Sequence, residues 1–281
     1  MPHARRARLL YVTDLAYPAR GRRYGDEDVF LSSRLRERFD LALCHPRDAA
    51  ALMDGFDAVV VRNSGPVLGY RQQYEVFRAR ATAEGVPVYN PLTGRADMAG
   101  KQYLPELSAA GYPVIPTVAG GTGTDRLPDA RSYVVKPLLG ADSIGLQTVP
   151  AGGLREAAAA PDVLVQPWLD IRHEISFCYV DDVFQYALYA PDPARRWELV
   201  PYRATDEDLR FARRFIDWNA MRHGIQRVDA CRTRDGRLLL VELEDLNPYL
   251  SLDALDDARR DAFVAAVTDS LHRFLADGTA R

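Results

Sequence analysis

Short apolar segments alternate with segments of helical spacing along the first part of the chain. The apolar segments have the length of buried strands, and they cover residues 9–13, 41–44, 58–61 and 86–89. The segments with helical spacing cover residues 26–39, 48–53 and 70–84. Strands that alternate with helices predict a doubly wound α/β unit built on a parallel sheet.

Polar residues follow the first and the third of these predicted strands. They are Asp14, Tyr17, Arg62, Asn63 and Ser64, and the Gly- and Arg-rich loop 19–25 also follows a strand. Ligands of parallel sheets bind beyond the carboxyl ends of the strands, so these residues are candidates for binding a small substrate. An aspartate suits the ammonium of an amino-acid-like molecule, and an arginine can clamp its carboxylate. The competing interpretation is a set of strand ends that are solvated and bind nothing.

The alternation ends at Asn90-Pro91, which predicts a domain boundary. A helix that carries Lys101 is expected at 97–110. Further strands are expected at 133–135, 146–149, 163–165, 174–180, 183–188, 227–231 and 238–244. Further helices are expected at 153–159, 205–221 and 258–275. The second half of the chain is therefore also α/β, but it is richer in hairpins.

The segment 132–149 combines a strand, a lysine and a glycine-bearing loop. Lys136 follows the apolar residues of the strand, and Gly140 and Gly145 enclose a loop that contains Ser143. Glycines let backbone N–H groups approach an anion, and a lysine adds a compact positive charge. The segment lacks the spacing of a P-loop but predicts a phosphate site. A hairpin that binds nothing would show the same pattern.

The scarcity of lysine strengthens this prediction. The 281 residues contain only two lysines, Lys101 and Lys136. The other 34 of the 36 lysines and arginines are therefore arginines. Almost every basic position of this chain is an arginine. The two positions that are lysine therefore indicate a role that arginine cannot fill. A compact ammonium fits between phosphate oxygens where a planar guanidinium does not.

The predicted hairpin at 227–244 carries a set of oxygen ligands. Arg227 and Asp229 alternate with apolar residues and so share one face of the strand. Glu242, Glu244 and Asn247 belong to the returning arm nearby. Oxygen ligands without cysteine or histidine suit Mg²⁺, which proteins usually share with bound phosphates. The competing interpretation is an ordinary hairpin with a solvated acidic face.

Composition narrows the class of protein. The net charge is −3, so no nucleic-acid partner is expected, and no apolar segment has the length of a membrane span. The first eight residues lack the apolar core of a signal peptide. The three cysteines are isolated within apolar segments, which is typical of free thiols in a reducing cytoplasm. We therefore expect a cytoplasmic globular protein, and the sequence leaves its oligomeric state open.

The order of these motifs resembles that of the ATP-grasp superfamily between about Asn90 and Asp253. Within it, the chain is similar to the branch of D-alanine–D-alanine ligases and glutathione synthetases. The resemblance implies that ATP and Mg²⁺ are bound. The residues implied to bind the nucleotide are Lys101 and Lys136 for phosphate, Gly140, Ser143 and Gly145 in the phosphate loop, Gln166, Pro167, Trp168 and Leu169 at the adenine hinge, and Glu174 for ribose.

The same resemblance assigns the hairpin. Arg227 matches the arginine on the phosphate side, and Asp229 and Glu242 match metal ligands. The family normally continues with E-x-N, whereas here the segment from Glu242 to Asn247 is longer. Whether Glu242 or Glu244 bridges the two ions is therefore open, and the spacing from Asp229 favours Glu242.

The resemblance also implies an activity and a domain organisation. Lysines and Mg²⁺ neutralise the triphosphate, a carboxylate attacks the γ-phosphorus, and a nitrogen nucleophile displaces phosphate from the acyl phosphate. Arg227 and Lys136 are the implied catalytic residues. The expected domains are an N-terminal α/β domain at 1–90, a central subdomain at 91–169 and a C-terminal subdomain at 170–281.

Three segments of the sequence indicate which substrate is used. Residues 13–28, 61–70 and 242–253 resemble the family of D-cycloserine synthetases. This resemblance implies a cyclo-ligase in which the activated carboxylate of O-ureido-D-serine is attacked by its own ureido nitrogen. Two alternatives stay open, namely an intermolecular ligase that joins two amino acids and, from another class, a nucleotide-dependent phosphotransferase without ligation. Formation of ADP only with a carboxylate substrate would distinguish a ligase.

Overall fold

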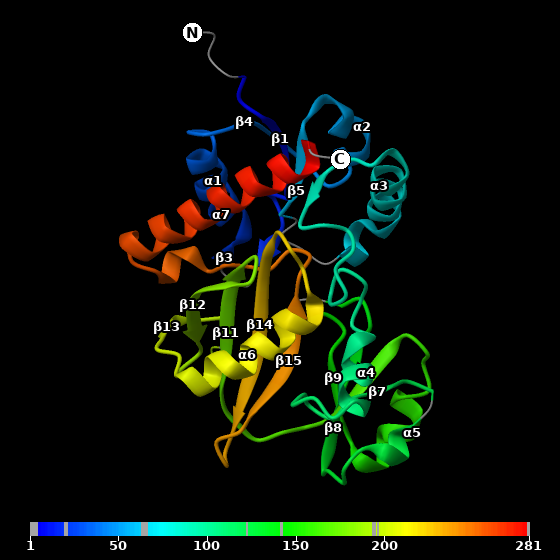
Figure 1. Cartoon of the computed structure of the whole chain (residues 1–281). Helices are drawn as coiled ribbons and strands as arrows, with labels where there is room; N and C mark the ends of the chain where they lie inside the picture. The colour runs from blue at the N-terminus through cyan, green and yellow to red at the C-terminus, as the bar shows by residue number, and fades with distance from the viewer. Residues whose placement is uncertain are drawn as a thin grey trace.

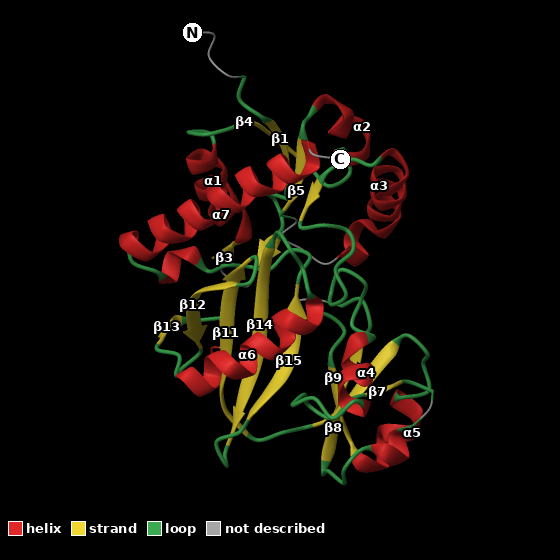
Figure 2. Cartoon of the chain, in the orientation of Figure 1, coloured by secondary structure: helices red, strands yellow, loops and turns green. Residues whose placement is uncertain are grey.

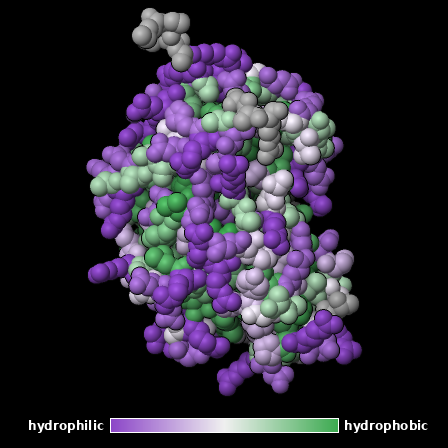
Figure 3. Space-filling model, in the orientation of Figure 1, coloured by the Kyte–Doolittle hydropathy of each residue, from purple (hydrophilic) through white to green (hydrophobic). Residues whose placement is uncertain are grey.

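The structure is a computed structural model that describes residues 5–19, 22–62, 67–121, 123–140, 143–192, 195 and 197–279. Its helices and strands form an α/β arrangement with three main sheets (Figures 1 and 2). Hydrophilic side chains cover most of the face seen in Figure 3, with smaller hydrophobic areas between them.

The N-terminal sheet has the strand order β4-β1-β5-β6, and all of its pairs are parallel. Its strands are β1 (Arg8–Val12), β4 (Asp40–Cys44), β5 (Ala58–Val61) and β6 (Val88–Tyr89). Three helices lie between or beside these strands, namely α1 (Tyr24–Leu35), α2 (Ala49–Leu52) and α3 (Arg71–Glu84). The same region contains the 3-10 turns Met53–Gly55 and Val67–Tyr70 and the short strand pair β2 (Pro18–Ala19) and β3 (Arg22–Arg23). The predicted parallel sheet is confirmed.

Alternate residues of β1 and β5 face two different cores. Leu9 and Val60 pack in the same core as Leu31 of α1, whereas Leu10 and Val59 pack with α2 and α3. Both faces of the sheet are covered by helices, which explains why β1 and β5 are almost continuously apolar in sequence.

The C-terminal helix α7 (Asp257–Thr279) lies across the N-terminal sheet, where Figure 1 shows the red end of the chain beside the blue one. Phe263 and Leu271 share a core with Leu9 of β1. The Tyr89 hydroxyl donates to Ser270 Oγ at 2.9 Å. Because the last helix packs on the first sheet, the two ends of the chain form one body.

The central sheet has the order β7-β10-β8-β9 and is antiparallel. Its strands are β7 (Val118–Ala119), β8 (Ser132–Pro137), β9 (Gln147–Pro150) and β10 (Val163–Pro167), accompanied by α4 (Tyr103–Ala109), α5 (Leu154–Ala157) and the 3-10 turns Thr124–Arg126 and Ala151–Gly153. The expected pairing of the two strands around the glycine loop is confirmed by the register Tyr133↔Val149.

The helix that was expected to carry Lys101 begins later than its sequence suggests. Helix α4 starts at Tyr103, so Lys101 lies in the preceding turn. Pro105 is the third residue of this helix. Proline is tolerated in the first turn because the N–H groups there have no intrahelical partner. The expected start at residue 97 was wrong, because it would have placed Pro105 in the helix interior.

The third sheet has the order β13-β12-β11-β14-β15. Its strands are β11 (Ile171–Val180), β12 (Val183–Tyr189), β13 (Val200–Tyr202), β14 (Ile225–Thr233) and β15 (Leu238–Glu244), with α6 (Asp206–Asn219) on one face and the 3-10 turn Leu252–Ala254 after β15. The capping box that the spacing of Thr205 and Asp208 predicts is present at the start of α6. The other face of this sheet carries the polar residues of the predicted site.

Candidate functional site

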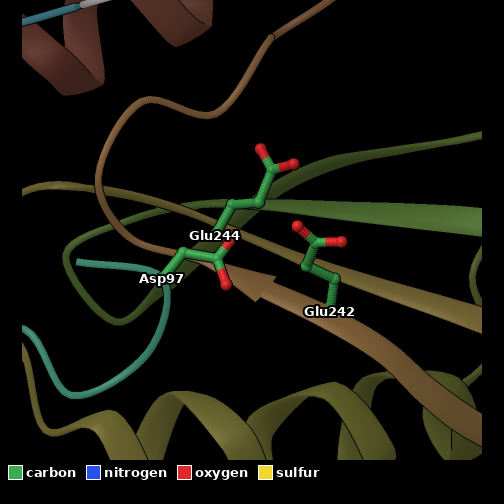
Figure 4. Close-up of side chains that lie close together, drawn as sticks. All are labelled: Asp97, Glu242 and Glu244. Carbon is green, nitrogen blue, oxygen red and sulfur yellow. The ribbon is translucent and has the colours of Figure 1, made fainter. Parts of the chain in front are cut away.

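Three carboxylates meet where the β14–β15 hairpin approaches the turn before α4. Oxygen atoms of Asp97, Glu242 and Glu244 lie within 4.8 Å of one another. Figure 4 shows the three side chains close together, two from β15 and one from the turn before α4. Glu242 and Glu244 are two residues apart on one strand and therefore point to the same face. Oxygen donors at this spacing suit a hard divalent cation such as Mg²⁺.

Lys101 reaches into this carboxylate cluster. Its side chain is buried, and its ammonium donates to Asp97 Oδ2 at 2.9 Å and to Glu242 Oε1. The lysine offsets part of the repulsion among three neighbouring carboxylates. A compact ammonium of this kind suits an anion such as a phosphate.

Asp245 holds the turn that carries Asp97. Its Oδ1 accepts a hydrogen bond from Met98 N at 2.7 Å, and its Oδ2 accepts one from Ala96 N at 3.1 Å. Asn219 Nδ2 also donates to Oδ2 at 3.2 Å. Burial raises the pKa of Asp245 to about 6. Because both backbone bonds flank Asp97, this buried carboxylate fixes the third member of the cluster.

Arg227 and Asp229 form the neighbouring half of the site. The guanidinium donates to both oxygens of Asp229 at 2.8–3.2 Å and to Glu244 Oε1 at 2.8 Å. Ser176 Oγ donates to Asp229 Oδ1 at 2.7 Å. Burial raises the pKa of Glu244, and the Arg227 charge opposes that shift. The strand register pairs Asp229 with Glu242 and Arg227 with Glu244.

Lys136 approaches from the central sheet. It lies on β8, and burial together with the Lys101 ammonium lowers the pKa of Lys136 to about 7, while Asp97 and Glu174 act in the opposite direction. The two lysines of the chain therefore come close enough to influence each other. One arises from the turn before α4 and the other from a strand, so the third and central sheets together frame the candidate site.

A prediction follows from the lowered pKa of Lys136. A bound triphosphate favours the charged ammonium, so nucleotide binding above pH 7 should take up a proton, and affinity should fall by at most about tenfold per pH unit as the pH rises. Calorimetry of a nonhydrolysable ATP analogue in two buffers of different ionisation heat measures this uptake. Lys136→Met should remove it, and equal uptake in the variant would contradict the assignment.

The glycine-bearing loop between β8 and β9 is described only in part. Gly140 is buried, Ser143 is exposed, and Ala141 and Asp142 lie outside the described residues. Gly145 has φ +76°, and a Cβ atom there would lie 2.8 Å from Pro137 Cγ. A side chain at Gly145 would therefore be strained in conformation and would also clash, so this position requires glycine.

The predicted hinge leads from β10 towards β11. Trp168 N donates to Ser132 O at 3.0 Å, and the Trp168 side chain is 52% exposed. Gln166 is buried, and its Nε2 donates to Thr117 Oγ1 at 2.8 Å. Glu174 lies on β11 and acts electrostatically on Lys136. The strand that follows the hinge therefore brings Glu174 close enough to Lys136 to act on it.

Pro167 and Leu169 of the hinge line a cavity that is separate from the carboxylate cluster. They line a cavity of about 710 Å³ together with residues of α6 and of the turn between β14 and β15. Phe211 and Leu238 in its lining belong to the core on the α6 face of the third sheet. Part of this cavity therefore lies on the α6 face of the third sheet, and the backbone of the hinge remains the candidate for adenine.

Of the substrate residues expected at the N-terminal strand ends, the structure describes Asp14, Tyr17 and Arg62. Asp14 is partly buried, its Oδ1 accepts from Ala16 N at 2.9 Å, and Oδ2 is 3.7 Å from His45 Nε2. Tyr17 N donates to Asp14 O at 3.3 Å. Asn63 and Ser64 lie outside the described residues.

Arg62 does not occupy the position expected for a substrate clamp. Its side chain is 3% exposed, and its guanidinium donates to Glu27 Oε1 at 2.9 Å and to Asp28 Oδ1 at 3.3 Å. The sequence placed this arginine at an open strand end. The physical reason for the difference is that two carboxylates of α1 cover it, so its donors face protein atoms.

Asp97 is the functional candidate that sequence reasoning missed. It lies four residues before Lys101 and makes an ion pair with it at 2.9 Å. A carboxylate four residues before one of only two lysines was the available signal. Asn247 lies in the loop after β15 and is partly buried.

Comparison with known proteins finds one curated relative in sequence and several similar solved structures. No family model matches the chain. The cycloserine biosynthesis protein DcsG of Streptomyces lavendulae is 27% identical over 251 aligned residues, covering 76% of this chain and 84% of that protein. The crystal structure of D-cycloserine synthetase DcsG superposes with a TM-score of 0.73 at 22% identity, covering 94% of this chain and 99% of that one.

Two further structures share the fold at lower identity. D-alanine–D-alanine ligase of Bacillus anthracis, complexed with ATP, gives a TM-score of 0.64 at 12% identity, covering 96% of this chain and 98% of that one. The ATP-grasp ligase PsnB, complexed with a precursor variant, Mg and ADP, gives 0.61 at 18% identity, covering 92% and 97%. The chain therefore has the fold that these ligases share. None of its described helices is both long and apolar enough to span a bilayer.

Proposed function

We propose that this chain, which has the fold of the ATP-grasp ligases, is an ATP-dependent ligase that activates a carboxylate for attack by a nitrogen nucleophile. One observation carries the proposal. The chain has only two lysines, and both approach one cluster of three carboxylates from different parts of the fold. Surface cations elsewhere are arginines, so this convergence points to a site for phosphate and a divalent metal.

The donor set fits Mg²⁺ and a triphosphate. Asp97, Glu242 and Glu244 offer carboxylate oxygens within 4.8 Å of one another, and Asp229 and Asn247 lie on the adjoining strand and loop. Mg²⁺ bound there would neutralise the charge that develops on the phosphates. The ligand set proposed from the sequence, Asp229, Glu242, Glu244 and Asn247, is thereby extended by Asp97.

The residues of the chain then have separate tasks. Lys101 and Lys136 contact the phosphates, and Arg227 stabilises the negative charge of the transferred phosphoryl group. The substrate carboxylate attacks the γ-phosphorus, the bond to the β-phosphate oxygen breaks, and ADP leaves. The nitrogen nucleophile then attacks the acyl carbon and expels phosphate, losing a proton as the amide forms. Water has to be kept from the acyl phosphate, which it would otherwise hydrolyse.

For the substrate we propose a cyclo-ligase reaction on O-ureido-D-serine that yields D-cycloserine. Similarity to DcsG over most of both chains supports this choice. The ureido nitrogen of the same molecule would attack the activated carboxylate, which closes the ring and releases phosphate. One water molecule would then hydrolyse the bond between that nitrogen and the carbamoyl group, which leaves as carbamic acid and decomposes to CO2 and ammonia. Asp14, Tyr17, Asn63 and Ser64 remain the proposed substrate residues. An intermolecular amino-acid ligase is the alternative within this class, and a cytoplasmic location fits either reaction.

The proposed domain division places the site between its parts. Residues 1–90 would contribute the substrate side, 91–169 the phosphate lysines, the hinge and Asp97, and 170–281 the other metal ligands. Helix α7 belongs to the last of these by sequence but packs on the first sheet.

The experiment that tests the function is a coupled assay of ADP release with a panel of amino-acid-like carboxylates, including O-ureido-D-serine. We expect ADP release to depend on the carboxylate, and mass spectrometry to show D-cycloserine from O-ureido-D-serine. A product that joins two substrates would favour the intermolecular ligase. A stable phosphorylated product would instead identify a phosphotransferase and contradict the proposal.

A further inference from the structure

The loop 245–251, which carries Asn247, is held by buried groups of the N-terminal unit. Arg62 Nη1 donates to Pro248 O at 2.8 Å. Leu250 N donates to Glu27 Oε1 at 2.9 Å and to Oε2 at 3.1 Å. Arg62 follows β5 and Glu27 lies on α1, so both contacts join parts of the chain that are far apart in sequence.

The same loop is held from the third sheet. Arg227 Nη1 donates to Tyr249 O, and the Tyr186 hydroxyl donates to Leu250 O at 2.8 Å. Every one of these contacts is made to the backbone of the loop, so they fix its path whatever side chains it carries. The backbone of Pro248, Tyr249 and Leu250, directly after Asn247, is thereby bound by charged or polar groups of the N-terminal unit and of the third sheet.

Arg62 is built to make several such contacts at once. Its three donor positions reach Asp28 at 3.3 Å, Glu27 at 2.9 Å and Pro248 O at 2.8 Å. Asp28 is fully buried and also accepts from the Tyr11 hydroxyl at 2.8 Å. The planar fork of arginine serves divergent acceptors, whereas the single ammonium of lysine cannot reach all of them.

Stability alone explains this cluster poorly. The side chains of Arg62, Glu27 and Asp28 are 3%, 4% and 0% exposed. Desolvating such charges costs several kcal/mol each, and buried ion pairs are often no more stabilising than apolar residues of the same volume. A buried charge cluster whose contacts converge on one loop is better explained by the position that it gives to that loop.

We propose that Arg62 and Glu27 are positioning residues that set the Asn247 loop against the carboxylate cluster, and that they thereby control how tightly the divalent metal is held. This inference rests on the proposed function, because it takes Asn247 as a metal-side residue. It replaces the clamp role that the sequence suggested for Arg62. Misplacing a ligand by about 1 Å is enough to weaken a preorganised site strongly.

The test measures metal binding without turnover. Mn²⁺ serves as the probe, and its dissociation constant is measured by electron paramagnetic resonance in the presence of a nonhydrolysable ATP analogue. Arg62→Met should weaken Mn²⁺ binding by about tenfold or more, in the range found when groups that orient metal ligands are removed. Arg62→Lys keeps the charge but loses divergent contacts, so it should weaken binding to a smaller extent.

Arg232 provides a matched control. It lies at the other end of β14 and forms an ion pair with the buried Asp208, and its Nη1 donates to Gly236 O at 2.7 Å. Arg232→Met therefore also breaks a partly buried ion pair and a backbone contact, but it does not touch loop 245–251. We expect it to lower the melting temperature while leaving the Mn²⁺ dissociation constant unchanged.

The outcomes separate this inference from the proposed function. An unchanged Mn²⁺ dissociation constant in a folded Arg62→Met or Arg62→Lys variant would overturn the positioning role alone. Equal weakening in Arg232→Met would also overturn it, because general destabilisation would then be the cause. A wild-type protein that does not bind Mn²⁺ together with the nucleotide would overturn the proposed function and, with it, this inference.

Discussion

Lys136→Met is expected to lower ATP-dependent turnover by at least about 10²-fold while leaving the protein folded, because removing one charge-stabilising donor from a desolvated active site has an effect of that size. Lys136 lies near Lys101, and burial has already lowered its pKa to about 7. Such an ammonium is unfavourable without an anion, so its removal should cost little stability. ADP release and thermal melting, measured on the same preparation, check both statements.

The conservative replacement sharpens this prediction. Lys136→Arg retains a positive charge but replaces a compact ammonium with a planar fork, so we expect it to be poorly active as well. Arg131→Met removes an exposed cation just before the same strand and should leave turnover near the wild-type rate. Near-normal turnover in both Lys136 variants would exclude this lysine from the site.

Glu242→Gln is expected to have the second large effect, a loss of Mg²⁺-dependent turnover of at least about 10²-fold, because it removes charge at the point where we propose that the phosphates and the metal meet. Glu242 pairs with Asp229 across the hairpin and contacts Lys101. Glu244 instead makes an ion pair with Arg227 at 2.8 Å. We therefore expect Glu244→Gln to be impaired less than Glu242→Gln.

Titration of Mg²⁺ against ADP release distinguishes the two glutamates. Glu242→Gln should need more Mg²⁺ and should not recover the full rate at saturation, whereas Glu244→Gln should recover more of it. Asp229→Asn and Asn247→Ala should both lower activity. If Glu244→Gln is inactive and Glu242→Gln is not, the assignment of the bridging ligand is reversed.

The parts of the fold with a regular period were predictable from the sequence. The parallel sheet follows from buried apolar strands alternating with helices, and strand β14 follows from the alternation around Asp229. The register that pairs Asp229 with Glu242 comes from the structure. Lys136 was identifiable because lysine is scarce in this chain. In each case the signal lies within one short segment, where local spacing decides the structure.

Features that depend on distant segments were not predictable. Asp97 joins the cluster because the buried Asp245 holds its turn through Ala96 N and Met98 N, a contact across more than 140 residues. Arg62 follows a strand as expected, but the sequence does not show that α1 and the loop at Pro248 cover it. Periodicity says which face of an element is apolar, but it does not say which distant element packs there.

The central claim is that a substrate carboxylate is activated by phosphorylation, and an isotope transfer tests it most directly. O-ureido-D-serine labelled with ¹⁸O in its carboxylate is incubated with the protein, ATP and Mg²⁺, and the released phosphate is analysed by ³¹P NMR. The account predicts that phosphate is released with one ¹⁸O atom, because the acyl oxygen leaves with the phosphoryl group when nitrogen attacks. Release of unlabelled phosphate, or retention of phosphate on the product, would contradict it.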